Sequence, residues 1–217
     1  MDNIPIMLMR FFVLAVSLSV HEAAHAFAAY HLGDDTAKRM GRLSLNPLVH
    51  LDPLGSLMML TGMPIGWAKP VPVNANNLHN PRTGMPLVSF AGPLSNIIMA
   101  LLGCLIYSFL GYSLGDSGWY LMLHIFIVVN FSLAIFNLLP IHPLDGANFI
   151  TAFMSDRVAA IYEEKVAMLG IYPLIAILIF ESTGSGFGLI SLWFRFWRPV
   201  VIPILQLFHV PIYFYPG

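Results

Sequence analysis

Long apolar stretches dominate the pattern of hydrophobic and polar positions along this chain. A helix needs about 20 apolar residues to cross a hydrocarbon core of about 30 Å. Three stretches reach that length, at residues 4–31, 86–112 and 119–139. Helices and closed barrels alone satisfy their backbone groups in lipid, so the pattern predicts an all-α polytopic membrane protein with these three spans.

Two weaker apolar stretches follow the third span. The first, residues 166–181, is short for a span, and the second lies within residues 186–214. Charged residues and prolines interrupt this second stretch at Arg195, Arg198, Pro199 and Pro203. The region is compatible with one kinked span, or with an interfacial segment followed by a short span. We therefore expect one to three further spans here.

The loop at residues 32–85, between the first two spans, is not uniformly polar. Its stretch "DPLGSLMMLTGMPIGW" (52–67) is apolar but too short to cross, which indicates a re-entrant or interfacial segment. In "GWAKPVPVN" (66–74), prolines alternate with valines. Proline has no N–H to donate, so any strand here is an edge strand. The loop therefore predicts a small β-like, re-entrant element.

Composition supports an integral membrane protein with one domain. The chain has 217 residues, of which 58% are hydrophobic and 10% charged, and its net charge is −1. We expect one membrane domain over residues 1–217, with a catalytic core at about 4–150 and C-terminal helices at about 151–217. The charge gives no indication of a nucleic-acid partner. A single cysteine, Cys104, excludes an intrachain disulfide and a cysteine-based metal site.

The first span contains the sequence "HEAAH" at residues 21–25. On a helix His21 and His25 lie about 40° apart and one turn along, so both imidazoles can bind one ion. Glu22 projects beside them, which gives the HExxH arrangement of two zinc ligands and a general base. Ionisable groups within a span are costly and are typically functional. The alternative is that the histidines hydrogen-bond to neighbouring helices.

A catalytic zinc site needs three protein ligands and an open position. Asp145 follows the third span, in a segment that Pro140 and Pro143 interrupt. Unwound backbone at membrane depth is tolerated where it lines a cavity, so a carboxylate here is a candidate third ligand. The alternative is that Asp145 caps the helix that follows it.

These residues suggest a hydrolytic mechanism. Zinc held by His21, His25 and Asp145 would keep one position for a water and lower its pKa towards neutrality. Glu22 would take the proton and deliver it to the leaving amine. Asn137 is a candidate hydrogen-bond donor to the developing oxyanion or to the peptide carbonyl. We expect Asn130 to make a packing hydrogen bond.

The chain resembles the site-2 protease family of intramembrane zinc metalloproteases. The resemblance rests on five motifs in family order, covering most of residues 17–150: "HEAAH" (21–25), "NPLVHLDPLGSL" (46–57), "GWAKPVPVN" (66–74), "FAGPLSN" (90–96) and "NLLPIHPLDG" (137–146). It implies a core built from the three long spans and an endopeptidase that hydrolyses bonds in or near transmembrane helices. It also implies one zinc ion on His21, His25 and Asp145, with Glu22 as catalytic acid and base and Asn137 assisting.

The expected partners are a transmembrane protein substrate and membrane lipid. The chain shows no PDZ or CBS domain, so substrate selection would come from the membrane domain, a regulatory membrane partner or a homo-oligomer. A substrate helix satisfies its own backbone groups and must unwind before cleavage. The segment "AKPVPV" (68–73) could receive the unwound substrate as an added strand.

The other histidines have less specific interpretations. His50 lies within a family motif, and we favour a structural role for it. His142 is three residues from Asp145 and is an alternative ligand. The remaining histidines are expected to be interfacial or helix-packing residues: His31, His79, His124 and His209.

Basic residues give the orientation. Lysines and arginines lie in the 32–85 and 140–165 loops, and none lies in the 113–118 turn. By the positive-inside rule both loops face the cytosol, so the N-terminus is outside. We expect a multi-pass protein of the cell membrane with its active site toward the cytosolic side.

Two other classes of protein would share part of this pattern. A divalent-metal transporter or metal-binding membrane protein would also place His, Asp and Glu in spans, but a transporter predicts repeated halves, and the chain has no evident repeat. An inactive adaptor of the same fold would have lost an essential residue, whereas His21, Glu22, His25 and Asp145 are all present.

Overall fold

The computed structural model describes four stretches of the chain: residues 4–60, 67–114, 117–182 and 188–212. All named elements in these stretches are helices. In chain order they are α1 (Ile4–His31), α2 (Thr36–Arg39), α3 (Pro47–His50), α4 (Pro53–Leu60), η1 (Ala75–Asn77), α5 (Pro81–Leu114), α6 (Gly118–Asn137), α7 (Asp145–Phe149), η2 (Ile150–Phe153), α8 (Asp156–Leu169), α9 (Tyr172–Ser182) and α10 (Leu189–Leu207).

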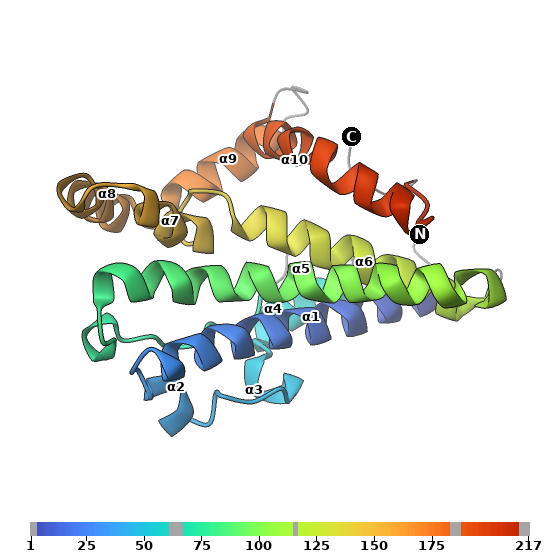
Figure 1. Cartoon of the computed structure of the whole chain (residues 1–217), viewed down its shortest axis with the longest axis horizontal. Helices are drawn as coiled ribbons and strands as arrows, with labels where there is room; N and C mark the ends of the chain where they lie inside the picture. The colour runs from blue at the N-terminus through green and yellow to red at the C-terminus, as the bar shows by residue number, and fades with distance from the viewer. Residues whose placement is uncertain (1–3, 61–66, 115–116, 183–187, 213–217) are drawn as a thin grey trace.

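Three helices form the body of the molecule. Helices α1, α5 and α6 lie side by side, and α5 runs opposite to the other two (Figure 1). Among the described residues these three alone are long and apolar enough to cross a membrane, which confirms the three predicted spans. Helix α5 starts at Pro81, earlier than the apolar pattern predicts, because Asn80 caps it: its Oδ1 accepts from the backbone N of Arg82 at 3.0 Å.

Small and apolar side chains pack the spans together. Ala100 and Cys104 of α5 are fully buried against Ile127 and Phe131 of α6. Small residues let helix backbones approach closely, which favours association in lipid. Large apolar side chains lie exposed on the outer side of α5, as expected for a surface that meets lipid tails: Leu101, Leu102, Leu105, Ile106 and Phe109.

The C-terminal helices lie along one side of the three spans (Figure 1). Helix α10 packs through Val201 and Leu205 into the core that α5 and α6 share, and Trp193 Nε1 donates to the Ile135 carbonyl at 2.7 Å. Helix α9 has 11 residues, too few to cross a membrane alone. The one to three further spans therefore stay a prediction.

The expected edge strand is reduced to one residue pair. Leu51 and Ala68 form a single antiparallel bridge, and within the described stretches no named strand continues it. Pro70 and Pro72 cannot donate to a ladder, which accounts for its end. The expected re-entrant segment is partly described: α4 covers its first half, and residues 61–66 lie outside the described residues.

The chain direction brings three span ends together. Helices α1 and α6 end, and α5 begins, at the same end of the bundle, where α7 also lies (Figure 1). The second half of α1 carries "HEAAH", and α7 begins at Asp145. Residues from distant parts of the sequence thus meet between the spans.

Candidate metal centre

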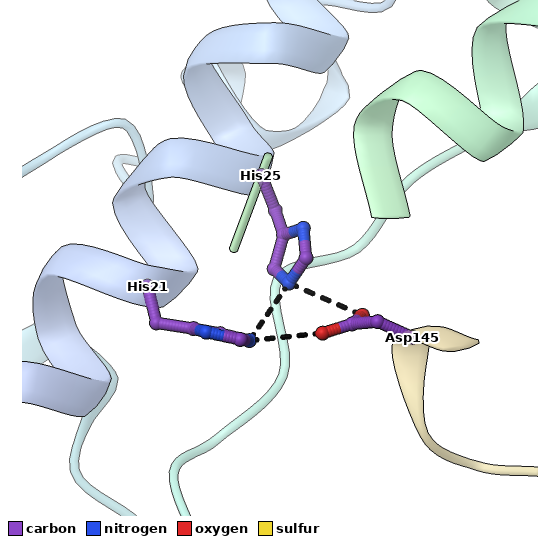
Figure 2. A group of neighbouring side chains, drawn as sticks. All are labelled: His21, His25 and Asp145. Carbon is purple, nitrogen blue, oxygen red and sulfur yellow. Dashed lines mark hydrogen bonds and ion pairs between the residues drawn. The ribbon is translucent and has the colours of Figure 1, made fainter. Parts of the chain in front are cut away.

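Two histidines of α1 and the first residue of α7 form a compact cluster (Figure 2). His21 Nε2 lies 3.0 Å from His25 Nε2 and 3.1 Å from Asp145 Oδ2. His25 Nε2 lies 3.3 Å from Asp145 Oδ1. In the described part of the chain, this is the one group of three or more His, Cys, Asp or Glu side chains with metal-binding spacing. The structure thus brings together the three predicted ligands.

A tight turn delivers Asp145 to this position. Helix α6 ends at Asn137, and a Cβ on Gly146 would clash with the carbonyl groups of Leu138 and Leu139. Glycine therefore allows the close approach of the turn to the start of α7. Leu144 is the N-cap of α7, with no side-chain cap hydrogen bond, and the Asp145 carboxylate faces the histidines instead. The capping alternative for Asp145 is therefore wrong.

The second ring nitrogen of each histidine, Nδ1, contacts a residue of α5. His25 Nδ1 lies 2.8 Å from the Val88 carbonyl, and His21 Nδ1 lies 2.6 Å from Asn96 Oδ1. The alternative, that the histidines hydrogen-bond to a neighbouring helix, thus holds for their Nδ1 atoms. Both Nε2 atoms instead face Asp145. Metal-binding histidines typically have this arrangement, with the second ring nitrogen held by a carbonyl or carboxylate.

The cluster fits a zinc ion. Zinc bonds to nitrogen and oxygen are about 2.0–2.2 Å long, so two ligands of a tetrahedral ion lie roughly 3.3 Å apart. The measured separations of 3.0 to 3.3 Å are close to that value. Asp145 Oδ2 is buried without a hydrogen-bond partner among the described residues. A buried carboxylate oxygen without a donor is costly unless a cation lies beside it.

Gly92 of α5 keeps the space beside the histidines open. A Cβ at this position would overlap His25 Nε2 and lie 2.6 Å from His21 Cε1. Real Cβ atoms do not approach that closely, so any larger residue here would displace the imidazoles.

Gly92→Ala is therefore expected to lower zinc affinity about 10- to 100-fold, because overpacking by one methyl group costs about 1–3 kcal/mol. Competition with a zinc chelator, on detergent-purified protein, measures the change. Gly84→Ala on the same helix is the control, since its Cβ would meet the movable Leu78 Cδ1 at 3.1 Å. Equal zinc affinity in Gly92→Ala and wild type would show that the imidazoles do not depend on this space.

Glu22 hydrogen-bonds to the 67–74 segment. Its Oε2 accepts a hydrogen bond from the backbone N of Val71 at 2.7 Å. Because Pro70 and Pro72 lack N–H groups, Val71 is the donor that this part of the segment can offer. The bond fixes one carboxylate oxygen, and with it the orientation of Glu22 one residue from His21.

A backbone hydrogen bond and the Arg42 side chain anchor the start of this segment. Lys69 donates its backbone N–H to the His50 carbonyl at 2.7 Å. The Arg42 guanidinium donates to the Lys69 carbonyl, and lies 3.4 Å from that of Pro70. His50 is itself fully buried, with Nε2 2.7 Å from the Ser44 carbonyl, which supports the structural role expected for it.

Asp34 anchors the other end of the segment. Its carboxylate is fully buried and accepts from the backbone N of Asn74 at 2.7 Å and from Asn77 Nδ2 at 3.0 Å. Burial alone would raise the pKa of Asp34, but hydrogen bonds from Thr36, Asn74 and Asn77 hold that pKa below its ordinary value. Asp34 is thus an ionised anchor at neutral pH. Sequence reasoning missed both Asp34 and Arg42, because their partners lie tens of residues away.

Two asparagines of α6 have different environments. Asn130 is fully buried and bonds to Ser17 Oγ at 2.9 Å and to Asn96 at 2.8 Å, which confirms the expected packing hydrogen bond. Asn137 Nδ2 donates to the Leu133 carbonyl one turn back in α6, at 2.9 Å. Its role in the reaction stays a prediction.

The remaining histidines lie apart from the cluster. His142 is described but does not belong to the metal-binding group, so the alternative ligand is not supported. His124 Nε2 lies 2.8 Å from the Pro211 carbonyl, and the His31 ring packs against Phe27. The contact of His124 fits a helix-packing role, whereas His31 is exposed and its ring contact lies within α1.

Comparisons with known proteins agree on one family. The model of peptidase family M50 matches residues 112–180, which include Asp145. YwhC of Bacillus subtilis, which is provisionally named a zinc metalloprotease, is 40% identical over 190 residues, covering 84% of each chain. The zinc metalloprotease MJ0392 of Methanocaldococcus jannaschii is 23% identical over 200 residues, which cover 87% of this chain and 50% of the relative. No solved structure matches the chain significantly.

Proposed function

The chain belongs to peptidase family M50, the site-2 protease family, and on that premise we propose that it is an intramembrane endopeptidase cleaving bonds in or near transmembrane helices. Zinc metalloprotease relatives imply zinc as its cofactor. The observation that carries the proposal is the cluster of His21, His25 and Asp145 between three helices that can each cross a membrane.

In this proposal His21, His25 and Asp145 hold the ion. Bound zinc supplies a Lewis acid that makes water nucleophilic at neutral pH. The Glu22 carboxylate takes a proton from the attacking water and delivers it to the leaving amine nitrogen. The Val71 N–H fixes Glu22 Oε2 at 2.7 Å, so the carboxylate is oriented before substrate arrives.

Asn137 and the 67–74 segment are proposed to bind substrate. The Asn137 amide nitrogen has two hydrogens, one of which bonds to Leu133, and the other would donate to the scissile carbonyl. The extended segment, anchored by Arg42 and Asp34, would pair with substrate backbone that has left its helix. A transmembrane protein is thus the substrate class that this geometry suits. Lipid surrounds the site, and a regulatory partner or second copy would add selectivity.

Cleavage of a purified single-span protein in proteoliposomes tests this function. The proposal requires zinc-dependent cutting of the membrane-embedded protein. A divalent-metal transporter, the competing function, would instead move ions across the same liposomes without cutting. Zinc uptake with no cleavage of any single-span protein would contradict the proposed protease function and support the transporter.

The proposed orientation places the active site toward the cytosol at the cell membrane. Lys38 and Arg39 lie in α2, just after α1 ends, and Arg82 lies in the first turn of α5, which begins at the same end of the bundle (Figure 1). Positive residues favour the cytosolic side, so the soluble fragment would be released inward.

Cysteine labelling checks this orientation. An impermeant maleimide is expected to label Asn76→Cys in inside-out vesicles and not in intact cells, with the opposite pattern for Gly118→Cys. Both residues are exposed, and the native Cys104 is buried, so wild type supplies the background. Labelling of Asn76→Cys in intact cells would show that the orientation is the reverse of the proposed one.

A further inference from the structure

Asn96, in the middle of α5, contacts both other spans. It is fully buried. Its Oδ1 lies 2.6 Å from His21 Nδ1, and its Nδ2 lies 2.8 Å from Asn130 Oδ1 and 3.4 Å from the Ser17 carbonyl. The mechanism above gives this residue no role, although it touches a proposed ligand.

A backbone carbonyl fixes the direction of every hydrogen bond in this chain of amides. Asn130 Nδ2 lies 2.9 Å from the Phe126 carbonyl, which can only accept, so the nitrogen of Asn130 must be on that side. Asn130 Oδ1 then faces Asn96 and can only accept, so Asn96 presents Nδ2 to it. The carbonyl oxygen of Asn96 is left for His21 Nδ1, which must therefore carry a hydrogen.

His25 also carries a hydrogen on Nδ1, and a single backbone carbonyl determines this. His25 Nδ1 lies 2.8 Å from the Val88 carbonyl, so it also carries the hydrogen. Metal binding requires neutral imidazoles, and a neutral imidazole has one N–H, so in that state both Nε2 atoms have a lone pair and no hydrogen. The Nε2 atoms and the two Asp145 oxygens then face one another as four acceptors without a donor, which is the electronic state that a cation requires.

We propose that Asn96 is the positioning residue of His21: supported by Asn130 and the Phe126 carbonyl, it selects the Nδ1–H tautomer and holds the ring for metal binding. This role rests on the proposed function of His21 as a zinc ligand. Because Asn96 is on α5, Asn130 on α6 and His21 on α1, the same bonds make zinc binding depend on the packing of all three spans.

Asn96→Ala removes the acceptor and is expected to lower zinc affinity about 10- to 100-fold, the usual effect of losing such an outer partner. Asn96→Asp keeps an acceptor for His21 but loses the Nδ2 that donates to Asn130 Oδ1, so its zinc affinity should lie between those of wild type and Asn96→Ala. Asn130→Ala leaves Asn96 in place but without its Oδ1 partner, so its zinc affinity should also lie between these limits. Ser95→Ala, the neighbouring residue whose Oγ bonds within α5 to the Gly92 carbonyl, is the matched control.

Chelator competition on the purified full chain measures zinc affinity, and the visible spectrum of the cobalt-substituted protein reports ligand geometry. A purely structural role would lower thermal stability without changing the cobalt spectrum, and rescue by Asp would not occur. Wild-type zinc affinity in Asn96→Ala overturns the proposal. If Asn96→Ala does not fold, wild-type zinc affinity and spectrum in Asn130→Ala overturn it. Failure of the proteolytic function would appear differently, as a wild type that binds zinc and does not cleave.

Discussion

Glu22→Gln is expected to lower cleavage of a single-span substrate by about 10²- to 10⁴-fold while leaving zinc content unchanged. Glutamine has nearly the same shape as glutamate, and its carbonyl oxygen can still accept from the Val71 N–H. An amide does not take up a proton near neutral pH, so the proton transfer from water is lost. His21, His25 and Asp145, the proposed ligands, are untouched.

Cleavage rate and zinc content are measured on the same purified sample, by product quantification and by metal analysis. Glu163→Gln is the matched control, because Glu163 is exposed on α8, away from the cluster. Its cleavage rate should equal that of wild type. A Glu22→Gln variant that cleaves normally would show that Glu22 does not transfer the proton.

Asp145→Ala is expected to lose zinc and cleavage together. It removes both oxygens that face the histidines, at 3.1 and 3.3 Å, and leaves two ligands where a catalytic zinc needs three. We expect zinc affinity to fall by more than about 100-fold, beyond the effect of losing an outer partner. Titration with zinc against a competing chelator measures this directly.

Asp156→Ala is the control for Asp145→Ala. Asp156 also begins a helix, α8, and its ion pair with Arg82, at 3.0 Å, lies largely in solvent. Such exposed pairs contribute about 0–1 kcal/mol, so the variant should bind zinc as wild type does. Retention of zinc at wild-type affinity by Asp145→Ala would show that a different residue completes the site.

The spans and the cluster were largely predictable from sequence because each depends on local patterns. The first span was predicted at residues 4–31, and α1 has those bounds, since its apolar stretch is bounded by polar residues at both ends. His21 and His25 face one point because any helix brings residues i and i+4 together. Asp145 was predicted as the third ligand because a carboxylate directly after a membrane span is costly without a functional partner.

The residues that position the site through long-range contacts were not predictable in the same way. Asn96 lies within the motif "FAGPLSN", yet its partners His21 and Asn130 lie on other helices, 75 and 34 residues away. No periodicity within α5 distinguishes it from a packing asparagine. Asp34 likewise looks like an ordinary loop carboxylate until Asn74 approaches it, 40 residues on. Long-range contacts, not local propensity, decide these roles.

The 67–74 segment shows where local propensity is insufficient. Alternating prolines indicated that any strand here would be an edge strand, and among the described residues the single bridge at Ala68 is the only strand pairing in this segment. Beside the backbone bond from Lys69 to His50, side chains hold the segment: Arg42 at one end and Asp34 at the other. A substrate strand, as proposed, would therefore meet a segment that is anchored at both ends.

An intramembrane protease must cut its substrate in or beside the apolar span, so the position of the cut is the decisive measurement. Wild type and Glu22→Gln are reconstituted with a purified single-span substrate, and the products are identified by mass spectrometry. We expect one or a few cuts within the apolar segment or at its cytosolic boundary, made by wild type with zinc and absent with Glu22→Gln. Cuts confined to soluble regions far from the span, or equal cutting by both proteins, would rule out the proposed intramembrane proteolysis.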